Sequence, residues 1–99
     1  MNNNSIERYS SKSIDEMRRI SLPLDIKEKM GLETGAGIIL QRINAMVILR
    51  LADEEENPST TIDQLGRITI PKELMQEMSW EIKSKVAIYY VDDKTVILR

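Results

Sequence analysis

The side chains that could carry chemistry in this 99-residue chain are carboxylates, lysines and arginines, because it contains neither histidine nor cysteine. This composition removes a thiolate nucleophile, an imidazole base and a histidine-based metal site. A site built from carboxylates alone or from a lysine stays open in principle, but no cluster of that kind stands out. Gly35-Ala36-Gly37 is too short a signal for a phosphate-cradling loop and indicates a turn. We therefore expect no enzyme activity, no metal and no cofactor.

Two pairs of a carboxylate and a cation recur at one spacing. Asp15 precedes Arg19 by four residues, and Asp63 precedes Arg67 in the same way. A short Asp side chain at a turn can accept backbone N–H groups two residues further on. Each arginine can pair with its aspartate and hold that turn, or contact another molecule, or do both.

These pairs belong to a repeat that fills most of the chain. Residues 14–51 and 62–99 align at an offset of 48, which becomes 49 after one extra residue near Asp92–Asp93. Each copy has about 40 residues, near the size at which a separate core fails without disulfides or metal. We therefore expect the two copies to share one core. Two units are too few for a solenoid and favour a closed, pseudo-two-fold object.

The repeat also sets the expected domain boundaries. We predict a flexible N-terminal arm over residues 1–9, a first repeat over 10–52, an acidic linker over 53–59 and a second repeat over 60–99, with both repeats in one folded domain. The N-terminus lacks the apolar region of a signal peptide, and the apolar runs are far too short for a membrane span. We expect a cytoplasmic protein that does not contact a membrane. Its net charge of −2 argues weakly against nucleic acid, although the acidic run at 53–56 causes most of the imbalance.

Each copy is predicted to contain the same elements in the same order. Alternation of apolar and polar residues indicates half-buried strands, and Pro followed by an acidic residue indicates the start of a helix about two turns long. A longer β-type run, a turn and a second run indicate a closing hairpin. The predicted strands cover 10–14, 20–22, 38–43 and 47–51 in the first copy and 58–62, 68–70, 86–91 and 95–99 in the second, with helices after Pro23 and Pro71 and hairpin turns at 44–45 and 92–93.

Some positions differ between the copies. Gly66 stands where the chain reverses and can supply a positive φ, whereas Arg18 takes that place in the first copy. Either Arg18 carries strain of roughly 1 kcal/mol or the first turn has another shape. Trp80 stands where Leu32 stands, so we expect it to pack in the core. The same role is expected of the methionines, namely Met17, Met30, Met46, Met75 and Met78.

The second copy carries a recognisable motif. Residues 62–74, IDQLGRITIPKEL, resemble the V-D-x-L-G-R-[IV]-x-I-P-x-E-L signature of the AbrB-like swapped-hairpin domain, which includes SpoVT/AbrB and MazE-type proteins. The first copy is similar, but Arg18 replaces the turn glycine and Leu24 replaces a polar residue. The resemblance implies a mostly β fold with short helices, a swapped-hairpin β-barrel formed by two tandem pseudo-two-fold repeats. Whether the hairpins exchange within one chain or between two stays open.

The resemblance also implies what the domain binds. Most relatives are transcription regulators that bind double-stranded DNA, and others are antitoxins. Phosphate contacts make such binding salt-dependent, and we predict that Arg19→Ala weakens it most. The resemblance implies DNA contacts at the positions that match the family's basic residues and at cations beside them. These expected DNA-binding residues are Lys12, Arg18, Arg19, Lys27, Arg67 and Lys72. The first copy would contribute more of this face, because Thr60 and Met75 replace Lys12 and Lys27.

Other readings stay open beside this one. Lys27 and Lys29 also fit an ordinary solvated helix face. Antitoxins of the MazE type carry a toxin-binding tail after the barrel, whereas this sequence stops at Arg99, so we place DNA binding before an antitoxin-like role. Under that second reading the acidic run or the N-terminal arm would meet a protein partner. A homodimer or a higher homo-oligomer is compatible with either role.

Overall fold

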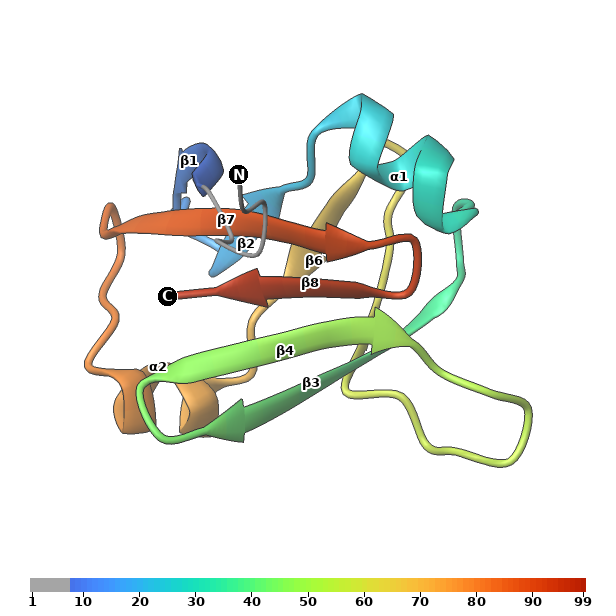
Figure 1. Cartoon of the computed structure of the whole chain (residues 1–99). Helices are drawn as coiled ribbons and strands as arrows, with labels where there is room; N and C mark the ends of the chain where they lie inside the picture. Colours follow the sequence, from blue (N-terminus) through green and yellow to red (C-terminus); the bar gives the residue numbers. More distant parts are fainter. Residues whose placement is uncertain (1–7) are drawn as a thin grey trace.

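Eight strands and two short helices make up residues 8–99, the part of the chain that the computed structural model describes (Figure 1). The expected mostly β fold with short helices is confirmed, and its main sheet is strongly curled. The elements are β1 (Arg8–Ser13), β2 (Arg19–Ser21), α1 (Leu24–Met30), β3 (Gly37–Ile43), β4 (Met46–Leu51), β5 (Thr60–Thr61), β6 (Arg67–Thr69), α2 (Lys72–Met78), β7 (Lys85–Asp92) and β8 (Thr95–Leu98).

The hairpins exchange between the two halves of one chain. The six-stranded sheet has the order β1-β7-β8-β4-β3-β5, so the hairpin β7–β8 pairs with β1, and the hairpin β3–β4 pairs with β5. The two hairpins meet where β4 runs beside β8. All these pairs are antiparallel. The sheet is therefore built by strands from both halves of a single polypeptide.

An approximate two-fold relation connects the halves. Ile48 pairs with Ile97 between β4 and β8, and Ile20 pairs with Ile68 between β2 and β6. Each of these pairs joins two residues at equivalent places in the repeat, so the axis passes between them. In agreement, the N–H of Ile70 donates to the carbonyl of Arg18 at 2.7 Å, and the equivalent N–H of Leu22 donates to Gly66 at 3.0 Å.

One apolar cluster contains buried side chains of both halves. Buried side chains come in equal numbers from the two halves, and Ile20, Ile68 and Val47 are among those with 0–1% exposure. Met75 is buried at 7%, whereas the equivalent Lys27 is a half-buried cation. Trp80 is partly buried and packs against this core, as predicted from its position in the repeat, which is equivalent to that of Leu32.

Both helices end where the backbone turns left-handed. Gly31 follows α1 with a φ of 67°, as its place after the helix predicts, and Ser79 follows α2 with a φ of 58°. A left-handed residue after the last helical turn lets backbone N–H groups bond the final carbonyls. At Ser79 this requires a non-glycine residue in a conformation that disfavours a β-carbon.

Several sequence predictions need correction. Strand β1 begins at Arg8, inside the expected arm, whose residues 1–7 lie outside the described residues. Strand β5 is confined to Thr60–Thr61, because the chain then bends into the next turn. The second hairpin turns at residues 93–94 rather than 92–93, because a register shift after Tyr90 lengthens β7. Met17 is not a core residue: it stands at a turn tip with 63% exposure.

Among residues 8–99, neither helix has the length and apolar character that crossing a membrane would require.

Candidate nucleic-acid interface

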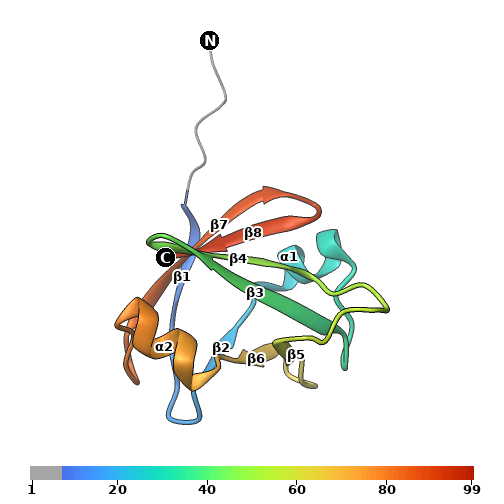
Figure 2. The same ribbon diagram turned by 90° about the horizontal axis from the view of Figure 1, so that it is seen from below.

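Strands β2 and β6 form a separate two-stranded ribbon, which lies on the side of the molecule opposite the β7–β8 hairpin (Figure 2). Successive side chains of a strand point to opposite faces. Ile20 and Ile68 point into the core, with exposures of 1% and 0%. The neighbouring residues Arg19 and Arg67 therefore share the outer face of this ribbon, at diagonal positions of its register.

The turn before each ribbon strand is built around an aspartate. Asp15 Oδ1 accepts the N–H groups of Met17 at 2.9 Å and Arg19 at 2.8 Å, while its Oδ2 accepts the Nε–H of Arg19 at 2.9 Å. Asp63 makes the same set of bonds to Leu65 and Arg67, at 2.8–2.9 Å. The carboxylates thus fix both the turn and the arginine that follows it.

These hydrogen bonds also lower the pKa of both aspartates. The backbone N–H of Arg19 is the main cause for Asp15, followed by partial burial, which acts in the opposite direction, and then by the arginine side chain. The pKa of Asp63 is lowered by the same groups of Arg67 in the same order. Both carboxylates therefore remain charged at neutral pH and hold their arginines.

The pairing with aspartate does not use the whole guanidinium group. Each arginine donates only Nε to its aspartate, and no hydrogen bond among residues 8–99 uses the terminal nitrogens of Arg19 or Arg67. The two side chains keep 30% and 25% of their surface exposed. The geometry accordingly shows that each arginine holds its turn, while its two terminal nitrogens make no hydrogen bond within residues 8–99.

Arg18 adds a cation beside this face. Its backbone is left-handed, with a φ of 62°, and the equivalent Gly66 has a φ of 78°. The first turn therefore has the same shape as the second and carries the strain foreseen for a residue with a β-carbon. The Nε–H of Arg18 donates to the carbonyl of Ile70 at 3.2 Å, which places the side chain at the start of the second half's helix.

Lys27 reaches the second turn from the helix of the first half. A β-carbon at Gly66 would collide with the Nζ of Lys27 and would stand 3.0 Å from its Cε. The lysine therefore lies over the turn at 63–66, close to Arg67. Since Lys27 lies against the turn of the other half and Arg18 lies at the first turn, these two basic residues are not gathered at one end of the ribbon. The sequence alone did not show this arrangement.

The remaining two predicted residues lie around the ribbon rather than on its outer face. Lys72 is the exposed first residue of α2, two positions after the Ile70 carbonyl that Arg18 contacts. Lys12 is half-buried on β1, opposite Val86 of β7. The exposed carboxylates Glu16, Asp25, Glu28 and Glu73 lie on the same turns and helices, so the surface carries both signs of charge.

The acidic segment after β4 is partly neutralised. It forms the loop that projects at the lower right of Figure 1. Glu56 and Arg50 make two hydrogen bonds, at 2.8 and 2.6 Å. The Arg50 side chain is the main reason that the pKa of Glu56 falls to about 2. This part of the acidic run is engaged with its own chain.

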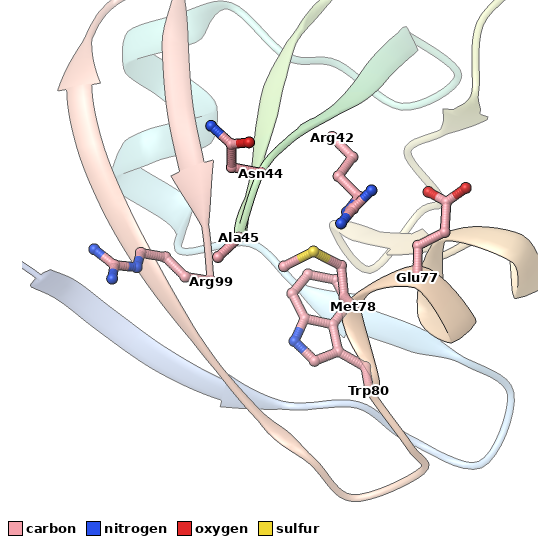
Figure 3. A pocket seen from close by; sticks show the side chains of 7 residues that line it. All are labelled: Arg42, Asn44, Ala45, Glu77, Met78, Trp80 and Arg99. Atoms are coloured by element: carbon pink, nitrogen blue, oxygen red, sulfur yellow. The ribbon is translucent and has the colours of Figure 1, made fainter.

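A cavity beside α2 was missed at the sequence level. Its volume is about 330 Å³, and Figure 3 shows Met78 beside the Trp80 indole with the Arg42 guanidinium directed toward them. Arg99 also lines the cavity, but its guanidinium points away from Trp80. Trp80 in place of Leu32 was the one available signal. No group of carboxylates in residues 8–99 is placed to hold a metal ion.

Comparison with known families agrees with part of the sequence interpretation. Residues 60–99 match the family model described as "Antidote-toxin recognition MazE, bacterial antitoxin", of the AbrB/MazE type. The match runs from β5 to β8 and covers less than half of the chain. Neither the curated proteins nor the solved structures contain a match to this chain.

Proposed function

We propose that this chain is a DNA-binding transcription regulator of the AbrB-like type, which acts in the cytoplasm and contacts double-stranded DNA with the β2–β6 ribbon. The match of residues 60–99 supports a role among antitoxins and DNA-binding regulators in general. The observation that favours DNA is the pair Arg19 and Arg67 on one outer face, each with its terminal nitrogens unused among residues 8–99.

The chemistry of these groups suits phosphate. Arginine presents a planar set of donors that matches phosphate oxygens, and an arginine held by a carboxylate loses less conformational freedom when it binds. Arg18 and Lys27 would extend the contact to either side of the ribbon, because they lie at its two turns. Lys72 would add a cation beside Arg18. Lys12, on β1, would contact the sugar–phosphate backbone of the DNA outside the part bound by the β2–β6 ribbon.

The proposal includes the organisation of the chain. Residues 10–52 would be a diverged copy of the unit matched at 60–99, and the two copies would form one domain. The exchange of hairpins and the equal share of both halves in the core support this view. A single chain would then provide the two turns that a dimer of one-unit chains would provide.

The test is binding of the full chain to a fluorescent mixed-sequence duplex at low salt, followed by anisotropy. Arg19→Ala removes a ribbon cation and should weaken binding roughly 5- to 50-fold. Arg42→Ala removes an exposed cation beside the Trp80 cavity and serves as the charge-matched control. Loss of affinity in Arg19→Ala alone supports the proposal. No binding of the unaltered chain, or equal losses in both variants, would contradict it.

A second candidate function is recognition of a protein partner, as in antitoxins. The family description supports it, and so does the Trp80 cavity, since aromatic residues are enriched at protein interfaces. Trp80 is the only tryptophan in the chain, so its fluorescence reports on this cavity directly. A toxin-type partner that shifts the Trp80 emission, without displacing DNA, would favour the second function.

A further inference from the structure

We infer that the ribbon face reads a non-palindromic duplex in one fixed orientation, an inference that rests on the proposed DNA-binding function. The two ends of the ribbon have the same backbone but different cations. We call the turn at 15–18, with the start of α2, the arginine end, and the turn at 63–66, with Lys27 of α1, the lysine end. Two identical chains in a symmetric dimer could not differ in this way.

The difference between the ends involves two coupled positions. At the lysine end, Gly66 has no side chain, and Lys27 occupies the space that a β-carbon would fill. At the arginine end, Arg18 takes the glycine's place, and the residue equivalent to Lys27 is Met75, which is buried at 7%. A long side chain at position 66 is incompatible with Lys27 in its observed place. These two positions therefore supply one cation at each end, from the turn in one case and from the helix in the other.

Neighbouring residues increase this asymmetry. Lys72 begins α2 at the arginine end, whereas the equivalent Leu24 begins α1 at the lysine end and is 66% exposed. Arg19 and Arg67, by contrast, are held in the same way by their aspartates. The ribbon arginines would therefore bind the duplex equally well in both directions. Only the ends distinguish one direction from the other.

The two end cations differ in what they recognise. A guanidinium can form two parallel hydrogen bonds to the O6 and N7 atoms of guanine in the major groove, whereas an ammonium group is a point charge that suits phosphate. Arg18 donates only its Nε–H to Ile70 among residues 8–99, which leaves the terminal nitrogens for a base. The arginine end would thus prefer a guanine that the lysine end does not require.

The orientation can be measured by directed DNA cleavage, because the chain contains no cysteine. Glu16 and Gln64 are equivalent, exposed residues at the tips of the two turns. Each is replaced by cysteine in the full chain and labelled with an iron–EDTA group that cleaves nearby DNA. The duplex is selected from a random library by the unlabelled chain. We expect each probe to cleave mainly one side of the DNA site, about tenfold more than the other side. The two probes should cleave opposite sides.

A symmetrised variant provides the control. Leu24→Lys, Lys27→Met and Gly66→Arg together give the lysine end the residues of the arginine end, and they should make each probe cleave both sides equally. If circular dichroism shows that this variant does not fold, Arg18→Gly with Lys27→Met and Lys72→Leu gives both ends the glycine, methionine and leucine instead. Persistent one-sided cleavage in the folded symmetrised variant would overturn the assignment to these residues.

The outcomes separate the two proposals. One-sided cleavage by both probes supports the fixed orientation. Two-sided cleavage by both probes on a bound duplex overturns it and leaves DNA binding intact. A library from which the chain retains no duplex at low salt overturns the proposed function, and the orientation with it.

Discussion

The ammonium group of Lys27 lies against Gly66, across the boundary between the two halves of the chain. A β-carbon at position 66 would displace the end of the Lys27 side chain, whereas the first turn holds Arg18 at a similar φ. It also places a first-half cation beside the second-half arginine of the ribbon. A helix that crosses to the other half thus decides where the charge of the proposed DNA face lies.

Replacement of Gly66 by alanine should cost more stability than replacement of Gly31. Both glycines have a positive φ, but nothing lies within 4 Å of a β-carbon at Gly31, whereas Lys27 would have to move for one at Gly66. We expect Gly31→Ala to cost about 1–2 kcal/mol in urea unfolding, and Gly66→Ala to exceed it. In a Lys27→Ala background the excess should disappear. An excess that persists would show that the contact with Lys27 is not its cause.

Ser79→Gly should stabilise the fold by roughly 0.5–1 kcal/mol. Ser79 has a φ of 58° at the end of α2, and among residues 8–99 its side chain makes no hydrogen bond. Gly31→Ser at the equivalent end of α1 is the matched control and should destabilise by a similar amount. The check is the midpoint of thermal unfolding, and a lower midpoint for Ser79→Gly would contradict the expectation.

The ion pair of Glu56 and Arg50 should make stability depend on pH in acid. Its hydrogen bonds lower the pKa of Glu56 from 4.5 to about 2. A lowered pKa in the folded state contributes stability that is fully present above the unfolded value and is lost as the pH falls through the folded value. Glu56→Gln should therefore be less stable than the unaltered chain above pH 4.5, and the difference should shrink toward pH 2. A difference in urea midpoint that stays constant over this range would rule out the pair as its source.

Shortening a buried side chain on the core-facing side of the β2–β6 ribbon should destabilise the whole domain. Ile68 is completely buried beside Ile20, where the halves meet, so Ile68→Ala should cost about 2–5 kcal/mol. Leu65, three residues earlier, is 70% exposed, and Leu65→Ala should change stability by less than about 0.5 kcal/mol. Unfolding in two separate steps, rather than one weakened transition, would contradict a core shared by both halves.

The local structure could be predicted from the sequence because it depends on short-range chemistry. Asp15 and Asp63 bond N–H groups within four residues, Pro23 precedes α1, and Gly31 ends it. The contact of Lys27 with Gly66 could not be predicted in this way. It depends on how the halves cross, which no local pattern encodes. The prediction that Met17 is a core residue was wrong. Met17 and Leu65, its equivalent in the repeat, are both exposed at turn tips.

The central claim is that Arg19 and Arg67 neutralise phosphates, and the most direct test is the salt dependence of DNA binding by Arg19→Ala/Arg67→Ala. Each lost phosphate contact should reduce the slope of log K against log salt by about 1. We predict a slope smaller by about 2 for this double variant, with an unchanged slope for Arg42→Ala. An unchanged slope in the folded double variant would contradict the account.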